Sequence, residues 1–195
     1  MIMYTCKEEY KNIIAVTNRK LSSRPFLEQI ERVCRLRPKA VILREKDIAE
    51  KEYAELAVKV LRLCKQYQVP CMLHTYLETA QKQDHAYIHL PLFLLRKYTG
   101  ELEGFLEVGC SVHSVEEAEE AQRLGATYLT AGHVYATDCK KGLPPRGLDF
   151  LKKVCTTVTI PVYAIGGIHT GTGQVQEVMA HGARGACIMS EMMRI

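Results

Sequence analysis

Short apolar runs rich in β-branched residues alternate along the chain with segments of helical periodicity. Eight of these runs have the length of a strand and are bounded by polar residues, glycine or proline. We predict strands at 13–18, 40–45, 70–75, 87–91, 107–113, 128–134, 161–167 and 185–190. Because the runs are almost continuously apolar, both faces of each strand are expected to be covered, as in a parallel sheet with helices outside it.

Between these runs, apolar residues recur at the spacing of a helix face. The clearest faces lie within 26–34, 53–64 and 115–124, so we predict helices there. Asp47 with Glu50, and Ser114 with Glu117, have the spacing of a capping box, which marks a helix N-terminus.

Eight strands alternating with helices predict an α/β protein with a (β/α)8 TIM barrel. An open doubly wound sheet is the alternative, but no GxGxxG follows the first predicted strand. We expect one domain over residues 1–195, in which the chain stops straight after the eighth strand and so lacks the final helix. A partner subunit or the first few residues would then cover the barrel wall beside strands eight and one, and we expect a homo-oligomer.

Composition narrows the class of protein further. The chain is 47% hydrophobic and 25% charged, which is typical of soluble globular proteins. It has no apolar run long enough to span a membrane and no signal peptide, so we expect a cytoplasmic protein without a membrane partner. The net charge of +4 is mild and the basic residues are scattered, which argues against nucleic acid as a partner. The eight cysteines form no CxxC pair, and we expect free thiols.

In barrels of this kind, reactive groups lie at the carboxyl ends of the strands. Cations, histidines and glycines gather at the predicted ends, whereas acids are scarce, which favours an anionic ligand. These strand-end residues are Thr17, Asn18, Arg44, Lys46, His74, Thr75, His89, Ser111, His113, His133, Gly166, Gly167 and Ser190. The histidines show no HxH or HExxH spacing, so we expect no histidine metal site.

Gly166 and Gly167 follow the seventh predicted strand, and Ser190 ends the eighth. Adjacent glycines let the backbone approach a ligand closely, and the loops after strands seven and eight form the customary phosphate site of the barrel. We therefore predict a phosphate site here, with a simple tight turn as the alternative.

His133 ends the sixth predicted strand, and a basic, proline-containing loop with Lys140 follows it. An imidazole that titrates near neutrality can carry a proton in both directions. The residues alone leave two interpretations open, a catalytic histidine and a packed core histidine.

Five segments resemble the thiamine phosphate synthase superfamily over about residues 13–190: "VILREKD", "SVHSVEEA", "GHVYATDCKKGLPPRGL", "IPVYAIGGI" and "GACIMS". The third is similar to the TenI branch, the thiazole tautomerases. This resemblance implies an isomerase without a cofactor that aromatises carboxythiazole phosphate, with His133 as the catalytic residue. It also implies that Gly167, Ser190 and Thr137 contact the substrate phosphate and that Arg44 and Lys46 bind its carboxylate. Ser111, Lys140 and Gly166 complete the predicted substrate-binding set.

Two departures from the synthase pattern favour the tautomerase. Synthases carry an Asn-Asp pair where this chain has His74 and Thr75, and a Gly-Gln followed by an acid where it has Pro91, Leu92 and Leu94. In the synthases those acids hold magnesium, which needs hard oxygen ligands. The alternatives are a synthase that joins hydroxymethylpyrimidine pyrophosphate to thiazole phosphate with magnesium, and a non-catalytic regulatory protein that binds a phosphorylated ligand.

Overall fold

The computed structural model describes residues 8–140 and 142–195. Its eight parallel strands follow one another in chain order around a closed barrel. The strands are Ile13–Val16 (β1), Ala40–Leu43 (β2), Cys71–His74 (β3), Tyr87–Pro91 (β4), Glu107–Val112 (β5), Tyr128–Gly132 (β6), Val162–Ile165 (β7) and Gly185–Ile188 (β8). The predicted α/β barrel is confirmed, and so is each predicted strand, most of them shorter than predicted.

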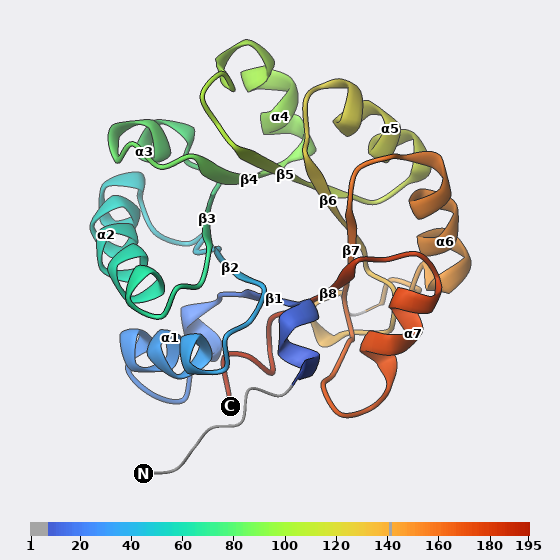
Figure 1. Ribbon diagram of the computed structural model, residues 1–195, viewed down its shortest axis with the longest axis horizontal. Helices are drawn as coiled ribbons and strands as arrows, with labels where there is room; N and C mark the ends of the chain where they lie inside the picture. Colours follow the sequence, from blue (N-terminus) through green and yellow to red (C-terminus); the bar gives the residue numbers. More distant parts are fainter. Residues whose placement is uncertain (1–7, 141) are drawn as a thin grey trace. The chain divides into compact units, whose positions relative to one another are not determined.

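Seven α-helices lie between the strands in the described part of the chain, and none follows β8. They are Phe26–Arg35 (α1), Glu50–Gln66 (α2), Leu77–Lys82 (α3), Leu92–Tyr98 (α4), Val115–Arg123 (α5), Gly147–Thr157 (α6) and Gln174–Ala180 (α7). Figure 1 shows each helix on the outer side of the strand that precedes it in the chain. The strands are buried on both faces as a result, which is why their sequences read as continuous apolar runs.

Residue contacts divide the chain into two compact units. The first runs up to His85 and includes the last residues, Ile188–Ile195, and the second is Ala86–Cys187. The expectation of a single domain stays a prediction.

In the first unit, β1, β2 and β3 pair in parallel, with Ala15 opposite Val41 and Ile42 opposite Met72. Tyr53 of α2 joins the ends of two of these strands. Its hydroxyl donates a hydrogen bond to the carbonyl of Leu43 at 2.7 Å and accepts one from the amide of His74 at 2.7 Å. Because burial raises the pKa of Tyr53, the phenol keeps the proton that it donates. This side chain therefore fixes the backbone just before Arg44 and at His74.

The last residues of the chain pack onto α1. Met192 and Met193 are fully buried, and the buried Gln29 of α1 donates to the carbonyl of Met192 at 2.7 Å. Arg24 donates to the carbonyl of Ile195. The end of the chain is therefore packed within the first unit. Cover of the barrel wall by a partner subunit or by the first residues, of which 1–7 lie outside the described part, stays a prediction. The oligomer stays a prediction.

In the second unit, β4 to β7 pair in parallel, and β7 also pairs with β8. His89 lies opposite Gly109, and Ser111 lies opposite Thr130. This register brings polar side chains of β4, β5 and β6 close to one another.

Of the two predicted capping boxes, one is confirmed in its N-cap at Ser114, although its carboxylate binds the amide one residue earlier than a capping box requires. The Ser114 hydroxyl accepts from the amide of Glu117 at 3.1 Å, and the Glu117 carboxylate accepts from the amide of His113 at 2.5 Å. The other is wrong, because α2 begins after Ala49 without a side-chain cap and Asp47 forms ion pairs instead.

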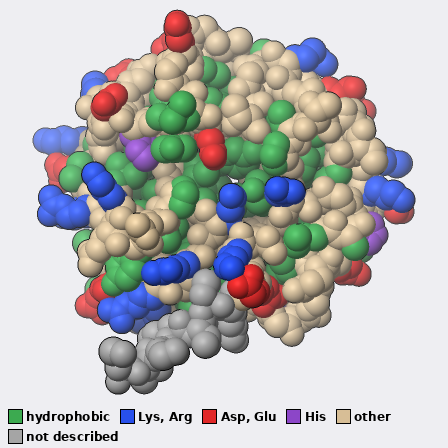
Figure 2. Space-filling model, in the orientation of Figure 1, with side chains coloured by type: hydrophobic (Ala, Val, Ile, Leu, Met, Phe, Trp, Pro, Cys, Tyr) green, Lys and Arg blue, Asp and Glu red, His purple; other side chains and the backbone are tan. Residues whose placement is uncertain are grey.

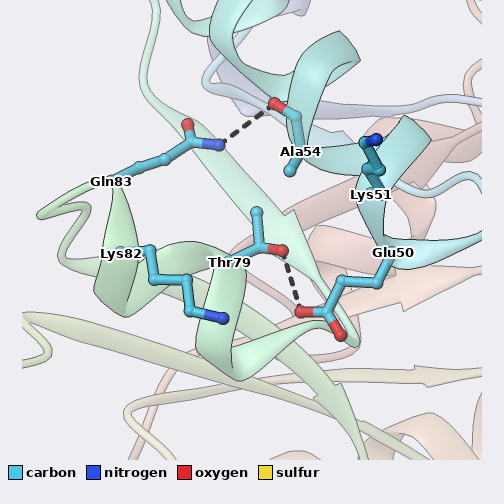
Figure 3. A pocket seen from close by; sticks show the side chains of 6 residues that line it. All are labelled: Glu50, Lys51, Ala54, Thr79, Lys82 and Gln83. Atoms are coloured by element: carbon cyan, nitrogen blue, oxygen red, sulfur yellow. Dashed lines mark hydrogen bonds between the residues drawn. The ribbon is translucent and has the colours of Figure 1, made fainter.

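The groove in Figure 3 lies between α2 and α3, with a volume of about 370 Å³. Two hydrogen bonds cross it, from the Thr79 hydroxyl to Glu50 at 2.9 Å and from the Gln83 amide to the carbonyl of Ala54 at 3.1 Å. No predicted strand-end residue lines it. We therefore interpret it as the joint between two helices and not as the candidate site.

The surface mixes charges of both signs. On the face shown in Figure 2, Lys and Arg side chains lie among Asp and Glu side chains and form no continuous stripe. Within the described residues, no helix is both long and apolar enough to cross a membrane. Six cysteines whose side chains are described are free thiols, as predicted: Cys34, Cys64, Cys71, Cys110, Cys155 and Cys187.

Candidate active site

A buried carboxylate connects the carboxyl ends of β1 and β2 in the first unit. Glu45, 2% exposed, accepts a hydrogen bond from the Thr17 hydroxyl at 2.7 Å. Both of its oxygens also accept from the amide of Arg19, at 3.1 and 3.0 Å. The Thr17 hydroxyl in turn accepts from the amide of Arg44 at 2.9 Å. The backbone that carries Arg44 is therefore fixed from both strands.

Two of the predicted cations, Arg44 and Lys46, are the neighbours of Glu45 in the sequence. Arg44 is half-buried and Lys46 is exposed. Nearby, Asp47 pairs with Arg19 at 2.9 Å and with Lys20 at 2.8 Å, and the hydrogen bond from Lys20 lowers the pKa of Asp47. This strand end therefore combines a cationic side chain on a rigid backbone with carboxylates that already have partners.

The raised pKa of Glu45 predicts a pH-dependent stability. Burial raises this pKa above its ordinary value of 4.5, and the bonds from Thr17 and Arg19 offset part of the effect. The folded protein then holds the proton more tightly than the unfolded chain, so this contribution to stability is complete below pH 4.5 and is lost as the pH rises through the folded-state pKa. We measure the free energy of unfolding by urea titration at a series of pH values from 4.5 upward. As the pH rises, this free energy should fall more in wild type than in Glu45→Gln.

The variant Glu52→Gln, at an exposed position, serves as the control. Parallel pH profiles for wild type and Glu45→Gln would contradict the prediction.

In the second unit, the loop after β7 lies directly against the loop after β6. Val134 and Tyr135 donate from their amides to the carbonyls of Ile165 and Gly166, at 2.9 and 3.0 Å. Gly166 and Gly167 have positive φ angles of 102° and 70°. A Cβ on Gly166 would fall on the Cβ of His133, and one on Gly167 would fall on the carbonyl oxygen of Ala136. The contact between the two loops accounts for both glycines, and their binding of phosphate stays a prediction.

His133 lies in the packed part of this region. It is 8% exposed, and its Nε2 is 3.4 Å from the carbonyl oxygen of Leu143 in its own loop. The loop also closes on the strand end, because Arg146 donates from its amide to the carbonyl of His133 at 2.9 Å. The ring is thus directed at its own loop.

The predicted loop residues share one short turn. Thr137 is half-buried and Lys140 is exposed, and the amide of Lys140 donates to the carbonyl of Thr137 at 3.0 Å. The turn Asp138–Lys140 is a 3-10 helix (η4). Lys140 therefore extends from a defined turn, and its role toward a substrate stays a prediction. The predicted role of Ser190, which lies in the first unit, also stays a prediction.

Sequence reasoning missed the partners of His89. The ring, 2% exposed, lies 3.0 Å through Nδ1 from the Tyr128 hydroxyl and 2.8 Å through Nε2 from the Ser111 hydroxyl. Tyr128 and Thr130 stand two apart in β6, so they point to the same face of the strand. That alternation of polar side chains inside an apolar run was the available signal.

Comparison with known proteins identifies the family. The thiamine monophosphate synthase (TMP-TENI) profile matches residues 13–192. The chain belongs to this family. It is 33% identical over 192 residues to a thiamine-phosphate synthase of Enterococcus faecalis, covering 96% of this chain and 88% of the relative. A thiamine-phosphate synthase of Fusobacterium nucleatum is 32% identical over 184 residues, covering 93% and 88%.

A solved structure shows the same relationship. The thiamine phosphate pyrophosphorylase of Pyrococcus furiosus superposes with a TM-score of 0.80 at 29% identity, covering 95% of this chain and 88% of that one. These relatives contradict the predicted tautomerase, since they carry the name of the synthase, a transferase. The isomerase assignment, in which His133 carried the proton, is therefore wrong, while the superfamily and an enzymatic, thiamine-related role are supported.

Proposed function

We propose that this protein is a thiamine-phosphate synthase, which joins hydroxymethylpyrimidine pyrophosphate to thiazole phosphate and releases pyrophosphate. The observation that carries the proposal is the identity to chains of that name over almost the whole length of both proteins. Likeness restricted to one segment would support the fold alone, whereas this match includes all eight strand ends.

The first unit contributes groups suited to the leaving pyrophosphate. When its bond to carbon breaks, negative charge grows on the departing oxygens, and fixed cationic donors stabilise that charge. Arg44 can bind two phosphate oxygens at once, and its backbone is held by Thr17. Lys46 adds a second charge from an exposed position.

The second unit contributes polar groups suited to a phosphate ester. Ser111 is half-buried and lies in a network of hydrogen bonds with His89 and Thr130. The loop of Gly166 and Gly167 is only partly buried, and backbone amides of such a loop can bind a phosphate. Both features support the proposed binding of thiazole phosphate.

Thiamine phosphate synthases use magnesium, so the donors of this chain must be tested for fit. The end of β3 offers His74 and Thr75, and β4 ends at Pro91. Throughout the described residues, no three His, Cys, Asp or Glu side chains gather in a way that could hold a metal ion. The residues at the ends of β3 and β4 offer no carboxylate to a magnesium ion, and we derive no step through it.

This donor set predicts that the protein alone does not bind magnesium. We expect no saturable heat when magnesium chloride is titrated calorimetrically into the protein at millimolar concentrations. Titration of the same solution into pyrophosphate provides the positive control. A saturable magnesium site on the protein in this concentration range would contradict the prediction.

The same finding favours a second candidate function, a protein that binds a phosphorylated thiazole without transferring a group. It would keep the strand-end cations and the glycine loop and would need no metal. Complementation separates the two candidates. Expressed in a bacterium that lacks its thiamine-phosphate synthase, the chain should restore growth without thiamine. Soluble expression without growth would overturn the synthase.

A further inference from the structure

A chain of buried hydrogen bonds connects β4, β5 and β6 inside the second unit. His89 stands in its middle, 3.0 Å from the hydroxyl of Tyr128 and 2.8 Å from that of Ser111. The Thr130 hydroxyl donates to Ser111 at 3.2 Å. His89 and Thr130 thus both contact Ser111, and Tyr128 contacts His89, at a cost in buried polar groups that a purely apolar core would avoid.

The intervening strand makes room for this network. Gly109 lies opposite both His89 and Tyr128 in the register of β5 with its neighbours. A Cβ on Gly109 would fall on Nδ1 of His89 and on the ring of Tyr128. The two rings can therefore meet only because this position has no side chain.

The network opens to its surroundings at one member. His89, Tyr128 and Thr130 are 2%, 4% and 2% exposed, whereas Ser111 is only partly buried. Ser111 also stands two residues beyond Gly109, nearer to the carboxyl end of β5. Ligands of parallel barrels bind at that end of the strands, so Ser111 is the member placed to contact one.

We propose that Tyr128 and His89 are positioning residues that turn the Ser111 hydroxyl into an outward-directed donor. In this arrangement the Tyr128 hydroxyl donates to Nδ1 of His89, and Nε2–H donates to Ser111. Together with the proton from Thr130, this fills the acceptor sites of the Ser111 oxygen, which leaves its own proton for a phosphate or ring-nitrogen acceptor of the ligand. The inference rests on the proposed function for the identity of that ligand, thiazole phosphate.

A double-mutant cycle tests the coupling. By calorimetry, Tyr128→Phe should weaken the binding of thiazole phosphate about threefold to tenfold, the loss typical of one hydrogen bond. In a Ser111→Ala background, Tyr128→Phe should have no further effect, because its influence passes through that hydroxyl. Tyr163→Phe, at a buried tyrosine whose ring packs edge-on against Tyr128 at 6.0 Å, is the matched control. Equal losses from Tyr128→Phe in both backgrounds would overturn the inference.

A second measurement needs no ligand. In nitrogen-15 spectra of the free protein, we expect His89 as a single tautomer with the proton on Nε2, and a mixture of tautomers in Tyr128→Phe. A wild-type proton on Nδ1 would overturn the inference. Failure of wild type to bind thiazole phosphate would instead overturn the proposed function. The tautomer of His89 would still test whether Tyr128 and His89 position the Ser111 hydroxyl.

Discussion

Arg44→Ala is expected to lower the rate of thiamine phosphate formation by about 10²–10³-fold, as removal of one fixed donor from a developing charge typically does. Hydrogen bonds through Thr17 and Glu45 fix the backbone of Arg44. The arginine therefore needs little reorganisation to bind pyrophosphate. Steady-state kinetics with both half-substrates measure the effect. Because Arg44 is only half-buried, we expect stability to change little.

Two further variants show whether charge or geometry matters at this position. Arg44→Lys keeps the charge but loses the two parallel donors, and we expect a rate between those of wild type and Arg44→Ala. Arg62→Ala removes an exposed cation from α2 and should leave the rate unchanged. A rate for Arg44→Ala within twofold of wild type would remove Arg44 from the site.

Gly167→Ala is expected to destabilise the protein more than an ordinary left-handed glycine replacement does. The left-handed conformation costs about 1–2 kcal/mol for a residue with a side chain. A Cβ here would also fall on the carbonyl of Ala136 and lie 2.8 Å from Cβ of Tyr135, which adds about 1–3 kcal/mol of overpacking. Urea denaturation measures the difference in the free energy of unfolding.

Gly171→Ala provides a closely matched comparison. Its φ of 69° almost equals the 70° of Gly167, but nothing lies within 4 Å of its added Cβ. The two variants therefore share the backbone strain and differ in the steric clash. Equal destabilisation would show that the loops after β6 and β7 are not in the described contact.

The strands could be predicted from the sequence because burial on both faces leaves a direct trace in composition. Runs such as Ile13–Val16 and Ala40–Leu43 are fully buried and contain only apolar residues. The packing of the chain end was harder to predict. The hydrogen bond from Gln29 to the carbonyl of Met192 joins residues 163 apart in the sequence, and no local pattern predicts such a contact.

The site could be predicted only in part, for the same reason. Strand ends indicated Arg44, Ser111 and the glycine pair, because topology alone places them at one end of each strand. The alternation of Tyr128 and Thr130 in β6 indicates polar side chains on one face of that strand, but their pairing with His89 and Ser111 depends on register and on the missing side chain of Gly109. Motif resemblance near His133 suggested a tautomerase, but a short motif carries less weight than identity over almost the whole chain.

The most direct test of the proposed function is to incubate the purified protein with hydroxymethylpyrimidine pyrophosphate and thiazole phosphate, with and without magnesium, and to quantify both products. The synthase predicts one thiamine phosphate for each pyrophosphate released, with both formed about 10²–10³-fold more slowly in the Arg44→Ala variant. Tight binding of thiazole phosphate with neither product formed would contradict it.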